Sequence, residues 1–199
     1  MVSFVPEEVL VQAVAVLRAG GIVAFPTETY YGLAVDPFQP LAIERLFRMK
    51  ARPLSKPVLV LLRNKAEIAL LATGTPPVFE ALMCRYWPGP LTLVFPALPS
   101  LPEELTAGTG GVGLRLSSSF IAQQLLAAFG GPLTATSANR SGEPAANSAF
   151  EAQQLCDKPY YFVLDGGATP GAPGSTVVGL QKGKLCCLRE GRISCTELL

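Results

Sequence analysis

Residues 21–36 have the sequence GIVAFPTETYYGLAVD, an apolar run followed by a turn rich in polar groups. The apolar run 21–27 predicts a buried strand, because it offers no polar face to water. Thr27, Glu28 and Thr29 follow at its end. Ligands bind beyond strand ends in open α/β sheets, so these side chains are placed to hydrogen-bond a small polar substrate. A plain turn or a helix N-cap is the structural alternative.

Helical and strand patterns alternate early in the chain, and strands cluster late. This order predicts an α/β fold with helices packed on one twisted, mixed sheet, and 199 residues suit a single domain, 1–199. The expected helices are 6–18, 40–52, 64–72, 76–87, 119–130 and 147–156. The expected strands after 21–27 are 57–62, 91–97, 112–116, 132–138, 160–167, 175–181 and 184–190.

The composition limits the chemistry that the chain can perform. It has no histidine, so catalysis must rest on carboxylates, lysine, a metal brought by the substrate, or electrostatic positioning. The net charge of +1 gives no bulk attraction to nucleic acid or membrane. The five cysteines lack metal-ligand spacing and indicate small, buried or half-buried thiols in a reducing cytosol. No apolar run has bilayer length, and we expect a soluble, cytoplasmic protein.

The stretch KARPLSKP, residues 50–57, places cations at the end of an expected helix. Lys50 lies three residues beyond Phe47, so it is aimed along the apolar face of that helix. Pro53 ends the helix, and Arg52 leaves it beside Lys50. The two cations either clamp a phosphate or complement the helix dipole while staying solvated.

TSANRSGEP, residues 136–144, again places polar side chains after a predicted strand. Its serine and asparagine groups either bind phosphate, ribose or base edges, or simply close a local turn. The chain has no P-loop and no GxGxxG turn after its first strand. Any nucleotide site is therefore predicted to differ from both of those types.

Taken in order, several motifs resemble those of the YrdC family, the threonylcarbamoyl-AMP synthases of tRNA modification. They are GIVAFPTETYYGLAVD, KARPLSKP, WPGPLTLVF, GVGLRL, TSANRSGEP, GSTVV and LREG, across about residues 9–192. The resemblance implies a compact fold around a deep cationic cavity. It also implies that L-threonine and bicarbonate form a carbamate, which takes AMP from ATP and releases pyrophosphate, with Mg²⁺ carried by the ATP. Downstream threonylcarbamoyl-transferase proteins and a weak contact with tRNA are the implied partners.

By motif position, the resemblance also implies roles for individual residues. Lys50 and Arg52 correspond to the family's catalytic pair facing the phosphates. The implied ATP contacts are Lys50, Arg52, Lys56, Asn139, Asn147 and Arg189. The implied threonine contacts are Thr29, Arg115, Ser137 and Ser175. A planar guanidinium at Arg115 suits the threonine carboxylate.

Three positions depart from the family pattern. Lys56 stands where many members have asparagine, Leu61 where longer archaeal-type members have histidine, and Gly111 where those members have threonine. Lys56 keeps a hydrogen-bond donor at its position, whereas Leu61 and Gly111 lack the side-chain contacts with substrate that histidine and threonine would make. The chain ends soon after LREG, and we expect the short, single-domain form of the family.

Two alternatives to the synthase remain. One is a family relative with weak or different activity. The presence of both Lys50 and Arg52, the family's K-x-R pair, argues against this alternative. The other is an RNA-binding module that uses the cationic cavity. The small net charge and the lack of an aromatic, basic stripe argue against that module.

Overall fold

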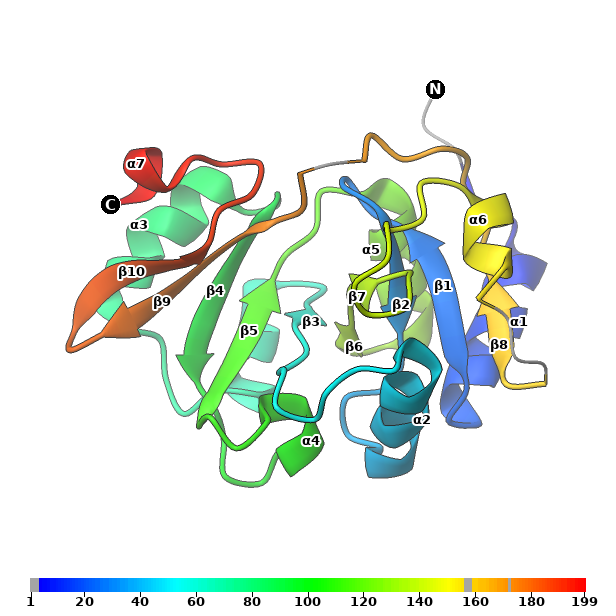
Figure 1. The fold of residues 1–199 in the computed structure, drawn as a ribbon, viewed down its shortest axis with the longest axis horizontal. Helices are drawn as coiled ribbons and strands as arrows, with labels where there is room; N and C mark the ends of the chain where they lie inside the picture. Colours follow the sequence, from blue (N-terminus) through cyan, green and yellow to red (C-terminus); the bar gives the residue numbers. More distant parts are fainter. Residues whose placement is uncertain (1–3, 156–158, 172) are drawn as a thin grey trace.

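The computed structural model describes residues 4–155, 159–171 and 173–199 (Figure 1). The strand predicted from the opening motif is present as β1 (Ile22–Pro26), and all of its residues are buried. It belongs to a four-stranded sheet, called here the smaller sheet, and pairs antiparallel with β2 and parallel with β8. Across this sheet the strands are β7 (Thr136–Ser137), β2 (Tyr31–Ala34), β1 and β8 (Tyr161–Val163).

A six-stranded sheet, called here the larger sheet, is built from the middle and the end of the chain. Inside it, β4 runs parallel to β9 and antiparallel to β5. β3 pairs parallel with β5 and antiparallel with β6, and β10 pairs antiparallel with β9. Across this sheet the strands are β10 (Lys184–Arg189), β9 (Thr176–Gln181), β4 (Leu91–Pro96), β5 (Gly111–Arg115), β3 (Val60–Leu61) and β6 (Leu133–Thr134).

The α/β class and the mixed strand pairing are confirmed, but the strands form two sheets where one was expected. The division falls inside the predicted strand 132–138, which breaks at Ala135 into β6 of the larger sheet and β7 of the smaller sheet. Thr134 joins the sheets at this point. Its backbone N–H donates to Val35 O at 3.0 Å, and its Oγ1 accepts from Val35 N at 2.9 Å.

Helices flank both sheets, mostly where predicted. The predicted helix 64–72 is a 3₁₀ helix, η1, and 147–156 extends to Cys156, which lies outside the described residues. α4, α7 and strand β2 were not predicted. The helices are α1 (Glu7–Arg18), α2 (Pro40–Lys50), η1 (Lys65–Leu70), α3 (Pro77–Tyr86), α4 (Glu103–Thr106), α5 (Phe120–Phe129), α6 (Ala149–Gln153) and α7 (Cys195–Leu198). Within the described ranges, no helix combines the length and the apolar character needed to cross a membrane.

Figure 1 shows the larger sheet on the left, beside α3 and α7, and the smaller sheet on the right among α1, α5 and α6. α1 and α5 pack on each other and on β1, around buried Leu17, Phe25 and Leu125. A second apolar cluster includes Phe79 and Phe95, whose rings meet edge to face with centroids 5.1 Å apart. Residues of both sheets, among them Leu33 of β2 and Leu114 of β5, belong to this second cluster.

Candidate functional site

A cavity of about 980 Å³ is lined by residues of both sheets and of the loop after α2. Its volume suits an organic ligand of nucleotide size. Most of the site residues predicted from sequence line it. They are Thr29, Arg52, Lys56, Arg115, Ser137, Asn139, Ser175 and Arg189. Lys50 and Asn147 are not among the lining residues.

Three lining residues are arginines whose charges act on one another. Burial lowers the pKa of Arg52, and the charge of Arg189 lowers it further. Burial and then the charge of Arg115 lower the pKa of Arg189. The cause in each case is that lost water and a nearby like charge both disfavour the cation. Guanidinium groups still stay protonated at neutral pH, so an anionic ligand would relieve their repulsion.

Arg52 reaches the cavity from the end of α2. Ala51 adopts a left-handed φ of 47°, which ends the helix, and Arg52 N donates to Phe47 O at 2.9 Å. The side chain then holds its own loop, because Nε donates to Lys56 O at 3.1 Å and Nη2 to Pro57 O at 2.8 Å. These bonds place the cations of Arg52 and Lys56 along the same cavity wall.

Lys50 leaves the same helix end in another direction. It is 1% exposed, which confirms the prediction that it points along the buried face of the helix. Its Nζ donates to the backbone O of Ser137, and to the O and Oδ1 of Asn139 at 2.7 and 2.8 Å. Burial, with a smaller effect of the Arg52 charge, lowers the pKa of Lys50 to about 7, whereas its three acceptors favour the ammonium form. In this structure the Lys50 ammonium therefore binds the loop that contains Ser137 and Asn139.

The loop held by Lys50 presents Ser137 and Asn139 to the cavity. Ser137 Oγ donates to Asn139 Oδ1 at 2.7 Å, and Asn139 Nδ2 donates to Glu143 O at 2.5 Å. The polar groups of TSANRSGEP thus close their own loop, as the structural alternative predicted. Both side chains nevertheless line the cavity, so the two interpretations of this motif are compatible.

The opening motif forms a turn and not a helix N-cap. Thr27 N donates to Tyr30 O at 3.0 Å, and Thr27 Oγ1 donates to the same oxygen at 2.7 Å. Thr29 N donates to Thr27 Oγ1 at 3.2 Å, and the two threonine hydroxyls lie 3.1 Å apart. Both threonines line the cavity. Glu28, between them, does not line it and faces Arg115, with Oε1 3.7 Å from Nε.

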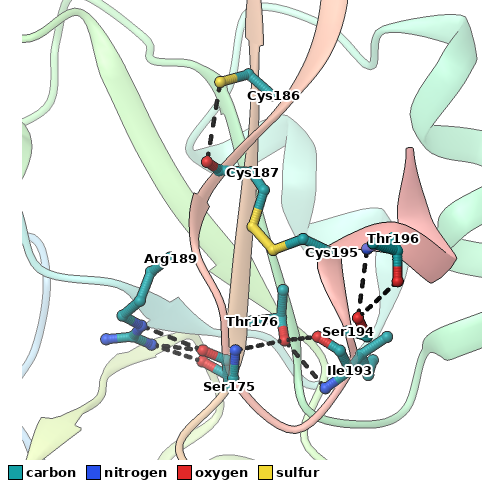
Figure 2. Close-up of a disulfide and its surroundings, with 10 residues drawn as sticks. Ser175, Thr176, Cys186, Cys187, Arg189, Ile193, Ser194, Cys195 and Thr196 are labelled. Carbon is teal, nitrogen blue, oxygen red and sulfur yellow. Dashed lines mark hydrogen bonds between the residues drawn. A yellow bond between two sulfur atoms is a disulfide. The ribbon is translucent and has the colours of Figure 1, made fainter.

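Arg189, at the end of β10, is held by Ser175 (Figure 2). Its Nε and Nη2 donate to Ser175 O at 3.2 and 2.7 Å, and Nη2 also donates to Ser175 Oγ at 3.1 Å. Ser175 Oγ lies 3.0 Å from Oγ1 of Thr92 in β4. Thr92 also lines the cavity but was not predicted to do so. The available signal was a single hydroxyl within the apolar run LTLVF.

Two of the cysteines are bonded to each other, which corrects the prediction of free thiols. Cys187 in β10 and Cys195 in α7 form a disulfide (Figure 2). Cys186 is a half-buried free thiol as predicted, whereas the free thiol of Cys84 is exposed. Cys156 lies outside the described residues. The pair is eight residues apart and is brought together by the turn after β10, which sequence spacing does not reveal.

Asn147 supports the segment beside α6. Its backbone N donates to Glu151 Oε2 at 2.6 Å, and its O accepts from Thr169 N at 2.8 Å. Its side-chain Oδ1 is buried and has no hydrogen-bond partner among the described residues. The structure therefore gives Asn147 a contact with the β8–β9 connection and no place in the cavity wall.

The three departures from the family pattern lie in two environments. Lys56 and Gly111 line the cavity, whereas Leu61 is fully buried in the core. A Cβ added at Gly111 would lie 2.9 Å from Val94 Cγ1, so a larger residue there requires Val94 to move.

Comparison with known proteins agrees with these motifs. A family model described as "Telomere recombination" (Sua5_yciO_yrdC) matches residues 15–191. The chain belongs to this family. A threonylcarbamoyl-AMP synthase of Pyrococcus abyssi is 35% identical over 186 residues, which cover 94% of this chain and 55% of that protein. A threonylcarbamoyl-AMP synthase of Thiobacillus denitrificans is 36% identical over 171 residues, covering 86% of this chain and 90% of that protein.

A solved member of the Sua5/YciO/YrdC family has the same fold. The crystal structure of P. abyssi Sua5 complexed with L-threonine matches with a TM-score of 0.87 and 34% identity, covering 95% of this chain and 56% of that one. The fold expected from the resemblance is therefore confirmed. This chain spans about half the length of the Pyrococcus protein and most of the Thiobacillus protein.

Proposed function

We propose that this Sua5/YciO/YrdC protein synthesises threonylcarbamoyl-AMP from L-threonine, bicarbonate and ATP. The observation that carries the proposal is the convergence of Arg52, Arg115 and Arg189 on one cavity. Guanidinium groups bind carboxylate and phosphate oxygens through paired hydrogen bonds, and the proposed reactants carry both groups. The names of the relatives and the L-threonine complex of one of them support the same substrates.

The proposed reaction has two steps. The amine of threonine attacks the bicarbonate carbon, and water leaves to give a carbamate. A carbamate oxygen then attacks the α-phosphorus of ATP, and the bond to pyrophosphate breaks. Neither step needs a covalent bond to the protein, so alignment of the reactants and stabilisation of charge can supply the catalysis. Such a mechanism suits a chain without histidine.

The cavity residues divide between the reactants in this proposal. Arg52, Lys56 and Arg189 bind the triphosphate, and Mg²⁺ enters as part of the substrate, bound to the ATP phosphates. Arg115 binds the threonine carboxylate, and Thr29, Ser137 and Ser175, which line the same cavity, bind threonine through their hydroxyls. Asn139, which also lines the cavity, binds the nucleotide in this proposal. Lys50 acts on substrate through the loop that it holds.

The proposed product is a reactive mixed anhydride, so a separate acyl-transfer reaction must consume it. We expect a threonylcarbamoyl-transferase protein to do so, with tRNA as final acceptor and at most a weak contact between tRNA and this chain.

The direct test is pyrophosphate release from Mg-ATP, with and without L-threonine and bicarbonate. Release that requires both co-substrates supports the synthase. Folded protein that binds ATP but releases no pyrophosphate contradicts it and favours the relative with weak or different activity. Salt-dependent RNA binding without any ATP binding favours the RNA-binding module.

A further inference from the structure

A buried carboxylate accompanies the arginine assigned to the amino acid. Glu28 Oε1 lies 3.7 Å from Arg115 Nε, and the two side chains are 12% and 4% exposed. Both atoms are buried, and neither has a hydrogen-bond partner among the described residues. At 3.7 Å the contact is an ion pair slightly longer than a hydrogen bond. Taking such a pair out of water is costly, and attraction at this distance offsets the cost only in part, so the pair is not explained by stability alone.

The position of Glu28 is fixed by contacts with other segments. Ser117 Oγ donates to its Oε2, and Arg192 Nη1 donates to its backbone O at 2.8 Å. Ser119 Oγ donates to Pro26 O at 3.0 Å, which joins the same turn to the segment after β5. The carboxylate is therefore held rigidly between the turn of the smaller sheet and the end of the strand that carries Arg115.

The contact with Glu28 lies on the Nε side of Arg115. A guanidinium has five donors in one rigid plane, so an anion beside Nε fixes the direction of the two Nη groups. Arg115 itself lines the cavity. Burial lowers the pKa of Arg115, and the Glu28 charge acts in the opposite direction.

We propose that Glu28 is a positioning residue that orients Arg115 toward the carboxylate of the amino-acid substrate. It also makes Arg115 electrostatically different from the other two cavity arginines. Arg115 has a carboxylate 3.7 Å from its Nε. Arg52 and Arg189 instead donate to neutral backbone oxygens, those of Lys56 and Pro57 and that of Ser175. The multiply charged triphosphate is thereby favoured beside Arg52 and Arg189, and a single carboxylate beside Arg115. This inference rests on the proposed function.

The test compares E28A, E28Q and wild type in pyrophosphate release, with L-threonine and ATP varied separately. We expect E28A to raise KM for threonine about tenfold, because the charge that orients the Arg115 guanidinium is lost, and to change KM for ATP less than about twofold. E28Q should recover part of the loss, because its amide oxygen keeps a partial negative charge beside Arg115 Nε. The matched control is E67A, which removes another buried carboxylate, paired with Arg63 outside the cavity. E67A should lower the melting temperature and leave KM for threonine unchanged.

The outcomes separate this inference from the proposed function. If E28A and E28Q keep the wild-type KM for threonine while R115A raises it, the positioning role is overturned and the proposed function stands. Equal losses of threonine and ATP affinity indicate a general structural role and also overturn it. If wild type releases pyrophosphate without threonine, the proposed function fails, and the inference fails with it. If E28A does not fold, E28Q alone decides, with a rise of about threefold expected.

Discussion

Lys50 and Asn139 are joined by two hydrogen bonds, at 2.7 Å to the backbone O of Asn139 and at 2.8 Å to its Oδ1. Asn139 in turn lines the cavity. A cation that the sequence places at the phosphates thus supports, in this structure, the loop that forms one cavity wall. Arg52, two residues later, lines the cavity itself, so the two members of the K-x-R pair have different surroundings.

Removing the Lys50 ammonium should weaken the fold and the site together. K50M keeps much of the side-chain volume but removes the donor of three hydrogen bonds, which run to Ser137 O and to the O and Oδ1 of Asn139. We expect the free energy of unfolding at neutral pH to fall by about 2 kcal/mol, and pyrophosphate release to fall with it. Urea denaturation measures the first effect, with K184M at an exposed lysine of β10 as the control. Equal midpoints for K50M and K184M would contradict the prediction.

Lys50 should also make stability depend on pH. Its pKa is about 7 in the folded protein and 10.5 for an ordinary lysine. Between these values the unfolded chain binds more protons, so the Lys50 contribution to the free energy of unfolding rises with pH, by at most about 1.4 kcal/mol per pH unit. At pH values below the folded pKa, Lys50 is charged in both states, and the cost of burying its charge lowers the free energy of unfolding by its full amount. The difference between wild type and K50M in urea at about pH 6, 8 and 9.5 isolates this contribution, and a flat difference would show that the pKa is not lowered.

Arg52 should matter for activity more than for stability. R52A removes a guanidinium from the cavity, and we expect kcat/KM for ATP to fall by an amount equivalent to about 2 to 4 kcal/mol. R48A is the matched control, because the Arg48 side chain, in the helix that precedes Arg52, is 77% exposed and forms a surface ion pair with Glu44. It should change the same quantity by less than about 0.5 kcal/mol. Similar kinetics for R52A and R48A would refute a phosphate role.

Gly191 should not tolerate a side chain. A Cβ at this position would lie 2.3 Å from Gly174 O, which forces the segment after β10 away from β9. We expect G191A to reduce stability by about 2 kcal/mol, and to reduce activity because Arg189 is two residues away. G74A is the control, since a Cβ there meets nothing within 4 Å. Calorimetric melting temperatures of the two variants, compared with wild type, decide the matter, and a wild-type value for G191A would contradict the packing argument.

Local patterns were sufficient to predict the elements whose apolar residues follow a regular spacing or form a continuous run. The apolar run at β1 and the helical spacing in α1 and α2 are such patterns, and all three elements are confirmed. Polar groups at strand ends were equally informative, because Thr29 and Ser137 line the cavity as expected. These features are determined by residues that lie close together in the sequence, so they can be predicted from the sequence alone.

The features that sequence could not predict depend on distant partners. β2 is a short strand containing Gly32, and only its pairing with β1 and β7 makes it a strand. The predicted strand 132–138 splits because its two halves pair with different sheets. The direction of Lys50 was predicted, but its acceptors were not, because they lie 87 and 89 residues away. Glu28 was noticed as a polar residue of the turn, but its contact with Arg115 exists only after β1 and β5 are both in place.

The hydrogen bond from Arg192 to Glu28 O joins residues 164 positions apart. During protein synthesis, the turn after β1, helix α2 and the loop after β7 leave the ribosome well before β9 and β10. A chain that is still being made can therefore fold one side of the cavity while Ser175 and Arg189, on the other side, have not yet been translated. Substrate binding should arise late in synthesis and in one step, so a ribosome-bound fragment that ends before β9 is expected to bind neither ATP nor threonine.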